Sequence, residues 1–339
     1  MANFTGSVIG VNKTAVKELN GLQPTSAYSL EKINGKPYLP GFAWETQTCP
    51  AGSWRAITYG AGKFVAVSSD VGSTSSVMTS TDGLTWTAQI TPAGKAWNDI
   101  TYGGGQFVAV GILGSPATQR IMTSPDGITW TLQTHTTCQL TSVAYGNGVY
   151  VAVSQSATPK ILISADGITW SDYNPANLTA SLIGRVRFFN GTFICCPSTP
   201  SANIAYSVDG ITWTIANTTA SGSWIGISLN TTGIFQYMLT SNSNTNKVYS
   251  NSGISGPYSI ASSSLSRLSY LMYSDISGVY VGSDSRSSLP FGLQRISTSS
   301  NGGTWTVRSG IPTINIIQSI AYGDNRLVAI GTDYVGVSY

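Results

Sequence analysis

The sequence predicts an all-β protein, a seven-bladed β-propeller of four-stranded blades, from three features of its 339 residues. A heptad first seen as STDGLTW recurs, and the tryptophans that end its copies lie 44, 40, 43 and then 92 residues apart. Each interval holds four short apolar runs separated by turns rich in Gly, Ser, Thr and Asn. An aromatic or leucine position in the first run of each unit occurs seven times. A period of this length with four strands per unit is typical of a propeller.

The strands can be assigned in order within the first unit, where apolar runs cover residues 54–60, 63–69, 76–80 and 85–89. Gly-rich and polar turns separate them, and the heptad joins the third run to the fourth. The next two units repeat this order closely, the fourth departs slightly, and the fifth lacks the Asp and Trp of the heptad. Seven equivalent first-strand positions follow from this alignment: Tyr59, Tyr102, Tyr145, Phe189, Leu229, Tyr273 and Tyr322.

The last unit stops after its third strand, and we expect residues 41–47 to supply the missing fourth strand. The segment GFAWETQ aligns with GLTWTAQ, which places Trp44 on Trp86. A strand from the N-terminal region would then complete the last blade and close the ring, so that no blade edge is left open.

Residues 1–40 lack the repeat and are expected to be an arm outside the propeller, which would span residues 41–339. The arm holds a large share of all charged residues, including Lys13, Lys17 and Glu18. Either it docks on a partner and becomes ordered there, or it is a strap along the surface of the propeller. The start of the chain lacks a basic segment followed by an apolar one, so we expect no secretion signal.

Composition excludes several classes of partner. Charged residues make up only 9% of the chain, and 17 basic and 14 acidic residues are spread without runs. Because no polybasic track exists, nucleic acid is not expected as a partner. No apolar run is long enough for a membrane span, so no membrane insertion is expected.

The metal-ligating residue types are few. Cys49, Cys138, Cys195 and Cys196 show no metal-site or disulfide-framework spacing, and His135 is the only histidine. A single histidine excludes a His-based catalytic triad and a zinc site with several histidines, and it is expected to be solvated in its polar loop. We expect no metal and no cofactor, while a carbonyl-bound ion in the central channel stays open.

The heptad resembles the Asp box, or BNR repeat, of sialidase-type propellers, in a variant where Asp and Gly are adjacent. Resemblance to this family implies a propeller over residues 41–339, and the chain is also similar to virion-associated receptor-binding or decoration propellers of phages. In the heptad, Ser and Asp oxygens should accept backbone N–H groups, Gly should adopt positive φ and Trp should pack between blades. The residues that carry the resemblance are Ser80, Asp82, Trp86, Ser124, Asp126, Trp130, Ser164, Asp166, Trp170, Ser207, Asp209, Trp213 and Trp305.

Catalysis is not expected. The sialidase resemblance would require three arginines, a Tyr paired with a Glu, and an Asp acid inside the ring. The chain has three glutamates, of which Glu18 and Glu31 lie in the arm and Glu45 lies beside the closing Trp44. Four of the eleven aspartates belong to heptads. We therefore predict no catalytic residues.

A binding surface is expected on the face opposite the heptads. Three tryptophans outside the heptads each precede the inner-strand aromatic or leucine position by five residues. Beside polar neighbours, such rings stack on sugars and the neighbours bond to hydroxyls. The alternative is that the rings fill gaps between blades. The candidate glycan-binding residues are Trp54, Arg55, Trp97, Asn98, Asp99, Arg185 and Trp224.

The hypothesis for function is a non-enzymatic structural or binding protein of a virus particle, such as a phage tail, fibre or capsid-surface component. Low charge, loops rich in Ser, Thr, Asn and Gly, and an arm suited to docking favour this interpretation. Expected partners are other virion proteins through residues 1–40, host surface glycan, and further copies of the chain within the particle. The alternatives are a soluble glycan-binding lectin and a sialidase-like glycosidase.

Overall fold

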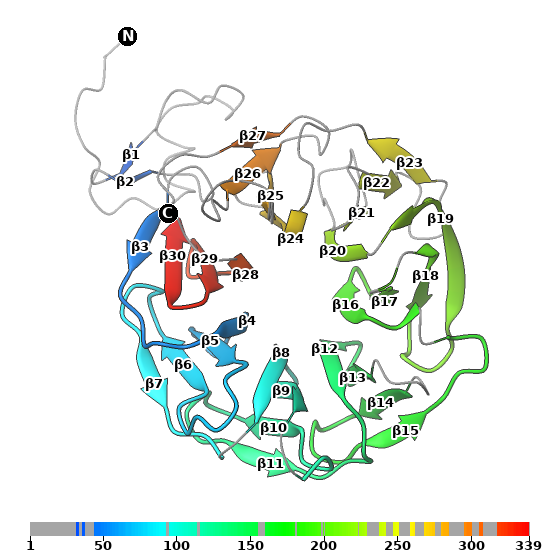
Figure 1. Cartoon of the computed structure of the whole chain (residues 1–339), viewed down its shortest axis with the longest axis horizontal. Helices are drawn as coiled ribbons and strands as arrows, with labels where there is room; N and C mark the ends of the chain where they lie inside the picture. Colours follow the sequence, from blue (N-terminus) through cyan, green and yellow to red (C-terminus); the bar gives the residue numbers. More distant parts are fainter. Residues whose placement is uncertain are drawn as a thin grey trace.

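Four-stranded antiparallel sheets stand in a ring around a central axis in the computed structural model of the chain (Figure 1). No helix in the described ranges has the length and apolar character needed to cross a bilayer. The structure describes residues 32–33, 36–37, 44–92, 95–113, 116–154, 160–179, 182–197, 199, 201–222, 224–228, 237–241, 247–250, 258–261, 268–274, 279–284, 295–299, 305–307 and 317–338.

Six of the sheets described are each formed by four strands that follow one another in the chain, with the first strand innermost in the ring (Figure 1). The first three are β4 (Trp54–Gly60), β5 (Lys63–Ser68), β6 (Val77–Ser80) and β7 (Thr87–Gln89); β8 (Ala96–Gly103), β9 (Gln106–Leu113), β10 (Ile121–Ser124) and β11 (Thr131–Gln133); and β12 (Leu140–Gly146), β13 (Val149–Ser154), β14 (Lys160–Ser164) and β15 (Ser171–Tyr173). The next three are β16 (Arg185–Phe189), β17 (Thr192–Cys196), β18 (Ser201–Ser207) and β19 (Thr214–Gly222); β20 (Trp224–Ser228), β21 (Tyr237–Ser241), β22 (Lys247–Ser250) and β23 (Tyr258–Ala261); and β24 (Leu268–Ser274), β25 (Val279–Asp284), β26 (Arg295–Ser299) and β27 (Thr306–Val307).

A further four-stranded sheet is composite. It joins β28 (Ile317–Gly323), β29 (Arg326–Gly331) and β30 (Tyr334–Ser338) to β3 (Glu45–Gln47) from the other end of the described propeller. β3 pairs with β30 through Glu45 opposite Val337 and Gln47 opposite Val335. Trp44, directly before β3, is buried among apolar residues of the composite sheet and of the β24–β27 sheet.

Two details of the predicted ring need correction. Among the described strands, the blades that are continuous in the sequence number six, and the predicted seventh unit is the composite four-stranded sheet, which takes strands from both ends of the chain. In the predicted closing strand, residues 41–47, the structure assigns β3 to Glu45–Gln47 and leaves Trp44 outside it, and 41–43 lie outside the described residues. In the predicted arm, the structure describes only β1 (Lys32–Ile33) paired with β2 (Lys36–Pro37).

The inner strand of the fourth blade is shifted by one residue from the predicted alignment. Phe188, not Phe189, pairs with Phe193, as Tyr145 pairs with Tyr150 one blade earlier. A Cβ placed on Gly146 would collide with the ring of Phe188, just as one on Gly103 would collide with Tyr145. Close packing of this glycine under the next aromatic ring therefore sets the register.

The heptad is a turn closed by its own hydrogen bonds. In the first copy, the hydroxyl of Ser80 donates to Asp82 Oδ1 at 2.9 Å, and the same carboxylate oxygen accepts the backbone N–H groups of Leu84 and Thr85. The indole N–H of Trp86 donates to the carbonyl of Gly83 at 2.9 Å. The copies ending at Trp130, Trp170 and Trp213 repeat this set of bonds.

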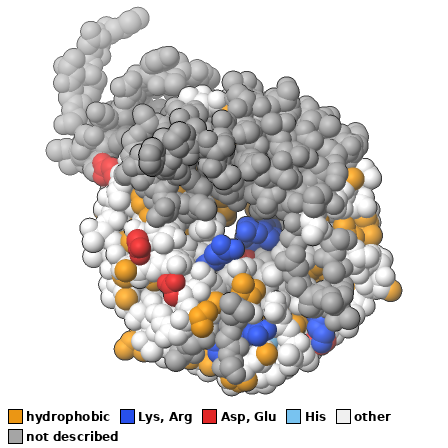
Figure 2. All heavy atoms as spheres, in the orientation of Figure 1, with side chains coloured by type: hydrophobic (Ala, Val, Ile, Leu, Met, Phe, Trp, Pro, Cys, Tyr) orange, Lys and Arg blue, Asp and Glu red, His pale blue; other side chains and the backbone are white. Residues whose placement is uncertain are grey.

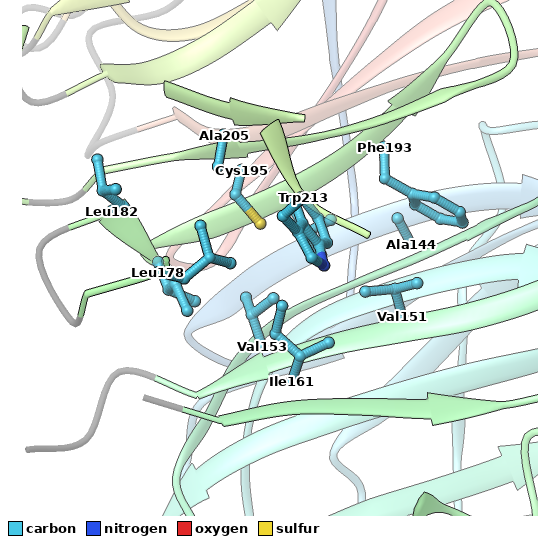
Figure 3. Packing of buried hydrophobic residues seen from close by; sticks show 12 residues of the cluster. Ala144, Val151, Val153, Ile161, Leu178, Leu182, Phe193, Cys195, Ala205 and Trp213 are labelled. Carbon is cyan, nitrogen blue, oxygen red and sulfur yellow. The ribbon is translucent and has the colours of Figure 1, made fainter. Parts of the chain in front are cut away.

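The heptad glycine and tryptophan fit each blade against the preceding one. Gly210 has φ +76°, and a Cβ there would lie only 2.6 Å from Cγ2 of Val151 in β13. Trp213 is buried with Val151 and Val153 of that same preceding sheet (Figure 3). Trp86 and Trp130 occupy the corresponding interblade clusters, and Trp170 is half-buried. For the drifted copy, the structure describes Ser299 and Trp305, and Trp305 is buried.

Replacing Gly210 with Ala should destabilise the fold by more than the cost of positive φ alone, which is about 1–2 kcal/mol, because the added Cβ also meets Val151. Gly148→Ala is the matched control, since Gly148 has φ +82° and nothing lies within 4 Å of its Cβ position. Urea unfolding of both variants would measure the two costs. Equal losses of unfolding free energy would show that the contact with Val151 does not matter.

The heptad aspartates should also make the free energy of unfolding depend on pH in the acidic range. Burial raises the pKa of Asp209, but the amides of Thr212 and Ile211 and the Ser207 hydroxyl outweigh it and lower the pKa from 3.8 to about 2. A depressed pKa in the folded state stabilises the protein above pH 3.8, and this stabilisation is lost as the pH falls towards 2. Asp209→Asn should therefore flatten the fall of unfolding free energy between pH 4 and 2, and an unchanged slope would contradict this assignment.

Candidate binding site in the central channel

Irregularities at the start of the inner strands turn polar side chains towards the centre of the ring. The pairing register shifts between Trp54 and Ala56 in β4, and at the corresponding places of β8, β12 and β28. A β-bulge of this type inserts one residue and redirects its side chain. Because the heptads join third to fourth strands, the starts of the inner strands lie at the opposite face of the ring. The inserted residues are Arg55, Asn98, Thr141 and Gln318.

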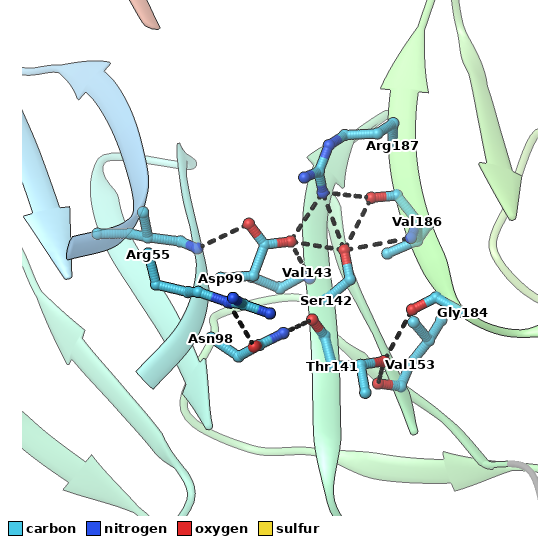
Figure 4. Close-up of polar contacts among 11 residues, drawn as sticks. Arg55, Asn98, Asp99, Thr141, Ser142, Val143, Val153, Gly184, Val186 and Arg187 are labelled. Atoms are coloured by element: carbon cyan, nitrogen blue, oxygen red, sulfur yellow. Dashed lines mark hydrogen bonds and ion pairs between the residues drawn. The ribbon is translucent and has the colours of Figure 1, made fainter. Parts of the chain in front are cut away.

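The bulge residues form a belt of hydrogen bonds from sheet to sheet. Arg55 donates from Nη1 to Gln318 Oε1 at 3.0 Å and from Nε to Asn98 Oδ1 at 3.3 Å. Asn98 donates to the carbonyl of Thr141, whose hydroxyl donates to the carbonyl of Gly184 (Figure 4). The belt thus ties five neighbouring sheets together, including the composite one.

Asp99 lies one residue further along β8 and is almost fully bonded. Its Oδ2 accepts from the hydroxyl of Ser142 at 2.5 Å, the N–H of Val143 at 3.2 Å and Nη1 of Arg187 at 2.7 Å. Its Oδ1 accepts the N–H of Ile100 at 3.1 Å. Only 6% of Asp99 is exposed. This carboxylate is therefore held in place by its partners and is poorly placed to exchange protons with a ligand.

Arg185 and Arg187 both belong to β16. Because they are two residues apart, their side chains lie on the same face of the strand. Burial lowers the pKa of Arg187, but Asp99 and Tyr270 outweigh it, so the pKa is raised. Burial and the nearby Arg187 lower the pKa of Arg185. Arginine side chains are not deprotonated in proteins, so both carry a positive charge. With Arg55, these residues are the channel arginines.

The predicted alignment of Phe189 with Tyr59 makes Arg185 the counterpart of Arg55, and the structure shows that this is wrong by one position. Gly184 receives the belt hydrogen bond in the fourth blade, so it is the counterpart of Arg55. Arg185 is instead the counterpart of Asp99 and Ser142, as the pairing of Phe188 with Phe193 requires. The shift brings Arg185 and Arg187 together on the channel side.

The channel contains a wider space and a narrow one that share lining residues. The wider cavity has a volume of about 220 Å³ and is bordered by Thr58, Thr101, Tyr145 and Phe189 as well as by the shared residues. The narrow space, of about 10 Å³, is bordered by Arg55, Asn98, Arg185 and Gln318. Asp99, Arg187, Tyr270 and Ser319 line both spaces.

The described lining of the channel carries a net positive charge. The described lining residues include three arginines and one aspartate. Figure 2 shows Lys and Arg side chains at the hollow in the middle of the visible face. All three channel arginines are partly exposed rather than sealed in the core, so water and small solutes reach them.

The predicted tryptophans do not form a sugar-stacking surface. Trp54 is 1% exposed and donates its indole N–H to the carbonyl of Pro50, and Trp97 is fully buried. Each lies in an interblade core, so the alternative of gap-filling is correct for these two. Trp224 belongs to β20, and its side chain lies outside the described residues. Arg55, Asn98, Asp99 and Arg185 do come together.

Sequence reasoning missed Ser142, Arg187, Tyr270 and Gln318 as channel residues. One of them, Arg187, could have been found from the sequence. It follows Arg185 at a spacing of two on a predicted inner strand, and side chains at this spacing lie on the same face of a strand. The others are small or neutral residues whose position depends on the bulges.

His135 is buried, which contradicts the expected solvated position. The N–H of Arg120 donates to Nε2 at 3.0 Å, so Nδ1 carries the proton and donates to the carbonyl of Thr136. Burial lowers the pKa of His135. This histidine is a neutral structural group. Within the described ranges, no three His, Cys, Asp or Glu side chains gather as a metal site would require.

A larger groove of about 450 Å³ lies away from the channel, at the outer edge of the third blade. Apolar side chains such as Ile163, Tyr173 and Ile211 line much of it. Its two carboxylates already have partners: Asp166 accepts hydrogen bonds within a heptad, and Asp172 forms an ion pair with Lys160 at 2.7 Å. The groove therefore lacks the clustered charge of the channel.

Comparison with solved structures supports the propeller fold. YCF48 bound to D1 peptide is 14% identical, with a TM-score of 0.66 over 88% of this chain and 99% of that chain. YCF48 from Cyanidioschyzon merolae is 16% identical, with a TM-score of 0.64 over 88% and 98% of the two chains. Virginiamycin B lyase from Staphylococcus aureus is 11% identical, with a TM-score of 0.69 over 88% and 99%. No protein-family model and no curated protein matches the sequence. At these identities the likeness extends to the fold alone.

Substitutions at Asp99 and Arg187 should be strongly coupled. Arg187→Gln removes the cationic partner of a buried carboxylate, and we expect a loss of about 2 kcal/mol of unfolding free energy. Asp99→Asn should partly relieve that loss, so the double variant should be more stable than the sum of the single losses predicts. Denaturant unfolding in a double-mutant cycle would measure the coupling, and additive losses would show that the ion pair contributes nothing.

Proposed function

We propose that the protein is a non-enzymatic binding and structural component of a virus particle, such as a phage tail, fibre or capsid-surface protein. Its ligand, a host surface glycan in this proposal, is recognised at the channel and not at the heptads. The observation that carries the binding role is the grouping of the channel arginines around one fully bonded carboxylate, Asp99. Such a set can hold a ligand, whereas hydrolysis of a glycosidic bond uses two available carboxyl groups.

The heptads support this division of roles. We interpret them as Asp-box-type turns, because the carboxylate accepts backbone N–H groups and the tryptophan packs on the preceding blade. Their polar atoms are therefore used within the fold. Function then belongs to the channel and to the loops at the opposite face, as on many scaffolds whose rigid strands position variable loops.

The virion role is supported by composition. Charged residues are only 9% of the chain, and its polar surface relies on Ser, Thr and Asn. Residues 1–40 lie outside the repeat and are the proposed attachment to other particle proteins. In this proposal several copies are arranged by the particle itself.

The test has two arms. Mass spectrometry of purified particles from the source should detect the chain, and particles assembled with a variant lacking residues 1–40 should not contain it.

On a glycan array, the full chain should bind a host glycan without releasing sugar, and Arg187→Gln should weaken binding while Lys160→Gln, which changes an outer ion pair, should not. Glycan binding by a chain absent from particles would favour the lectin alternative, and sugar release would favour the glycosidase.

A further inference from the structure

We propose that the channel arginines form a site for an oxyanion, a carboxylate, sulfate or phosphate group that ends a larger ligand. This inference rests on the proposed binding role of the channel and specifies the chemistry of the ligand. It places one oxygen of the anionic group in the narrow space beside Arg55, Arg185 and Arg187, and the rest of the group with the attached part of the ligand in the wider cavity.

The first support is the imbalance of charge. Asp99 forms an ion pair with Arg187 at 2.7 Å and so compensates one of the three cations. Among the described residues, Arg55 donates only to the neutral amide oxygens of Gln318 and Asn98. Arg185 has no ion pair within the described part of the chain. Holding cations in a confined space without counter-charge is costly, and an anion bound between them would offset that cost.

The second support is the set of unused donors. Each guanidinium carries five N–H groups in a planar fork that matches the geometry of carboxylate and phosphate oxygens. Arg187 makes its three hydrogen bonds through Nη1, and its other terminal nitrogen points away from them in Figure 4. Arg55 uses Nε and Nη1, and Arg185 makes no side-chain hydrogen bond to another described residue. Donors from two different blades therefore remain for a ligand.

The third support is the shape of the channel. The narrow space of about 10 Å³ has room for one oxygen atom of such a group, since a whole water molecule needs about 10–15 Å³ by this measure. It adjoins the cavity of about 220 Å³, with which it shares lining residues such as Tyr270 and Ser319. Tyr145, Phe188 and Phe189 give the wider cavity an aromatic border. An anionic tip at the arginines with an uncharged body beside these rings matches both spaces.

Isothermal titration with sodium sulfate, sodium phosphate and sodium acetate at low ionic strength tests this inference on the full chain. We expect at least one of these anions to bind with a stoichiometry of one, and Arg185→Gln to weaken it about tenfold or more. Arg185→Lys keeps the charge but removes the fork, so it should bind with intermediate affinity. Lys160→Gln loses the same charge at the outer edge of the third blade and should bind as the unmodified chain does.

Thermal unfolding of each variant shows whether the fold is retained, and Arg55→Gln provides a second test if Arg185→Gln does not fold. The inference is overturned if none of the three anions binds, or if Arg185→Gln and Arg55→Gln bind as tightly as the unmodified chain. Binding of a neutral glycan without any anion binding would overturn this inference and leave the proposed function intact. Anion binding by a chain that recognises no glycan and joins no particle would overturn the proposed function and leave this inference intact.

Discussion

Closure of the ring is the constraint on which the rest of the structure depends. β3 supplies the outer strand of the composite sheet, and Trp44 fills the position that heptad tryptophans fill elsewhere. Hydrogen bonds also join the two ends of the described propeller, at what we call the seam. Gly52 and Asp333 exchange two hydrogen bonds, and Arg326 donates to the carbonyl of Asp82. A ring closed in this way leaves no open blade edge to pair with another chain. It also brings Arg55 within reach of Gln318, so the hydrogen-bond belt of the channel crosses the seam as well.

The heptad solves a packing problem that every blade shares. Its glycine lets one blade approach a valine of the preceding sheet, and its aspartate closes the turn without help from outside. Because the same solution recurs, the blades need few charged groups for stability. The charges that the chain does have inside the ring are concentrated in the channel, where Asp99 organises Ser142 and Arg187. This separation of a structural face from a charged interior is the basis of the proposed binding role.

Much of the architecture could be predicted from the sequence because period and turn chemistry are local. The heptad contains every group needed for its own hydrogen bonds, and the alignment of Trp44 with Trp86 identified the strand that β30 lacks. The channel was less predictable because it depends on β-bulges, which leave no clear mark in the pattern. A bulge at Arg55 leaves Trp54 pointing into the interblade core, so an expected surface ring is buried. The one-residue shift in β16 likewise hid which positions of this strand correspond to the channel residues of its neighbours.

Comparing two truncated chains by denaturant unfolding tests the role of ring closure most directly. A chain starting at Trp44 retains β3, and a chain starting at Thr48 lacks both Trp44 and β3. We expect one cooperative transition for the longer chain and, for the shorter one, a loss of at least about 3–5 kcal/mol of unfolding free energy, the usual cost of truncating a buried tryptophan to alanine. Equal unfolding free energies for the two chains would contradict the claim that this strand holds the ring closed.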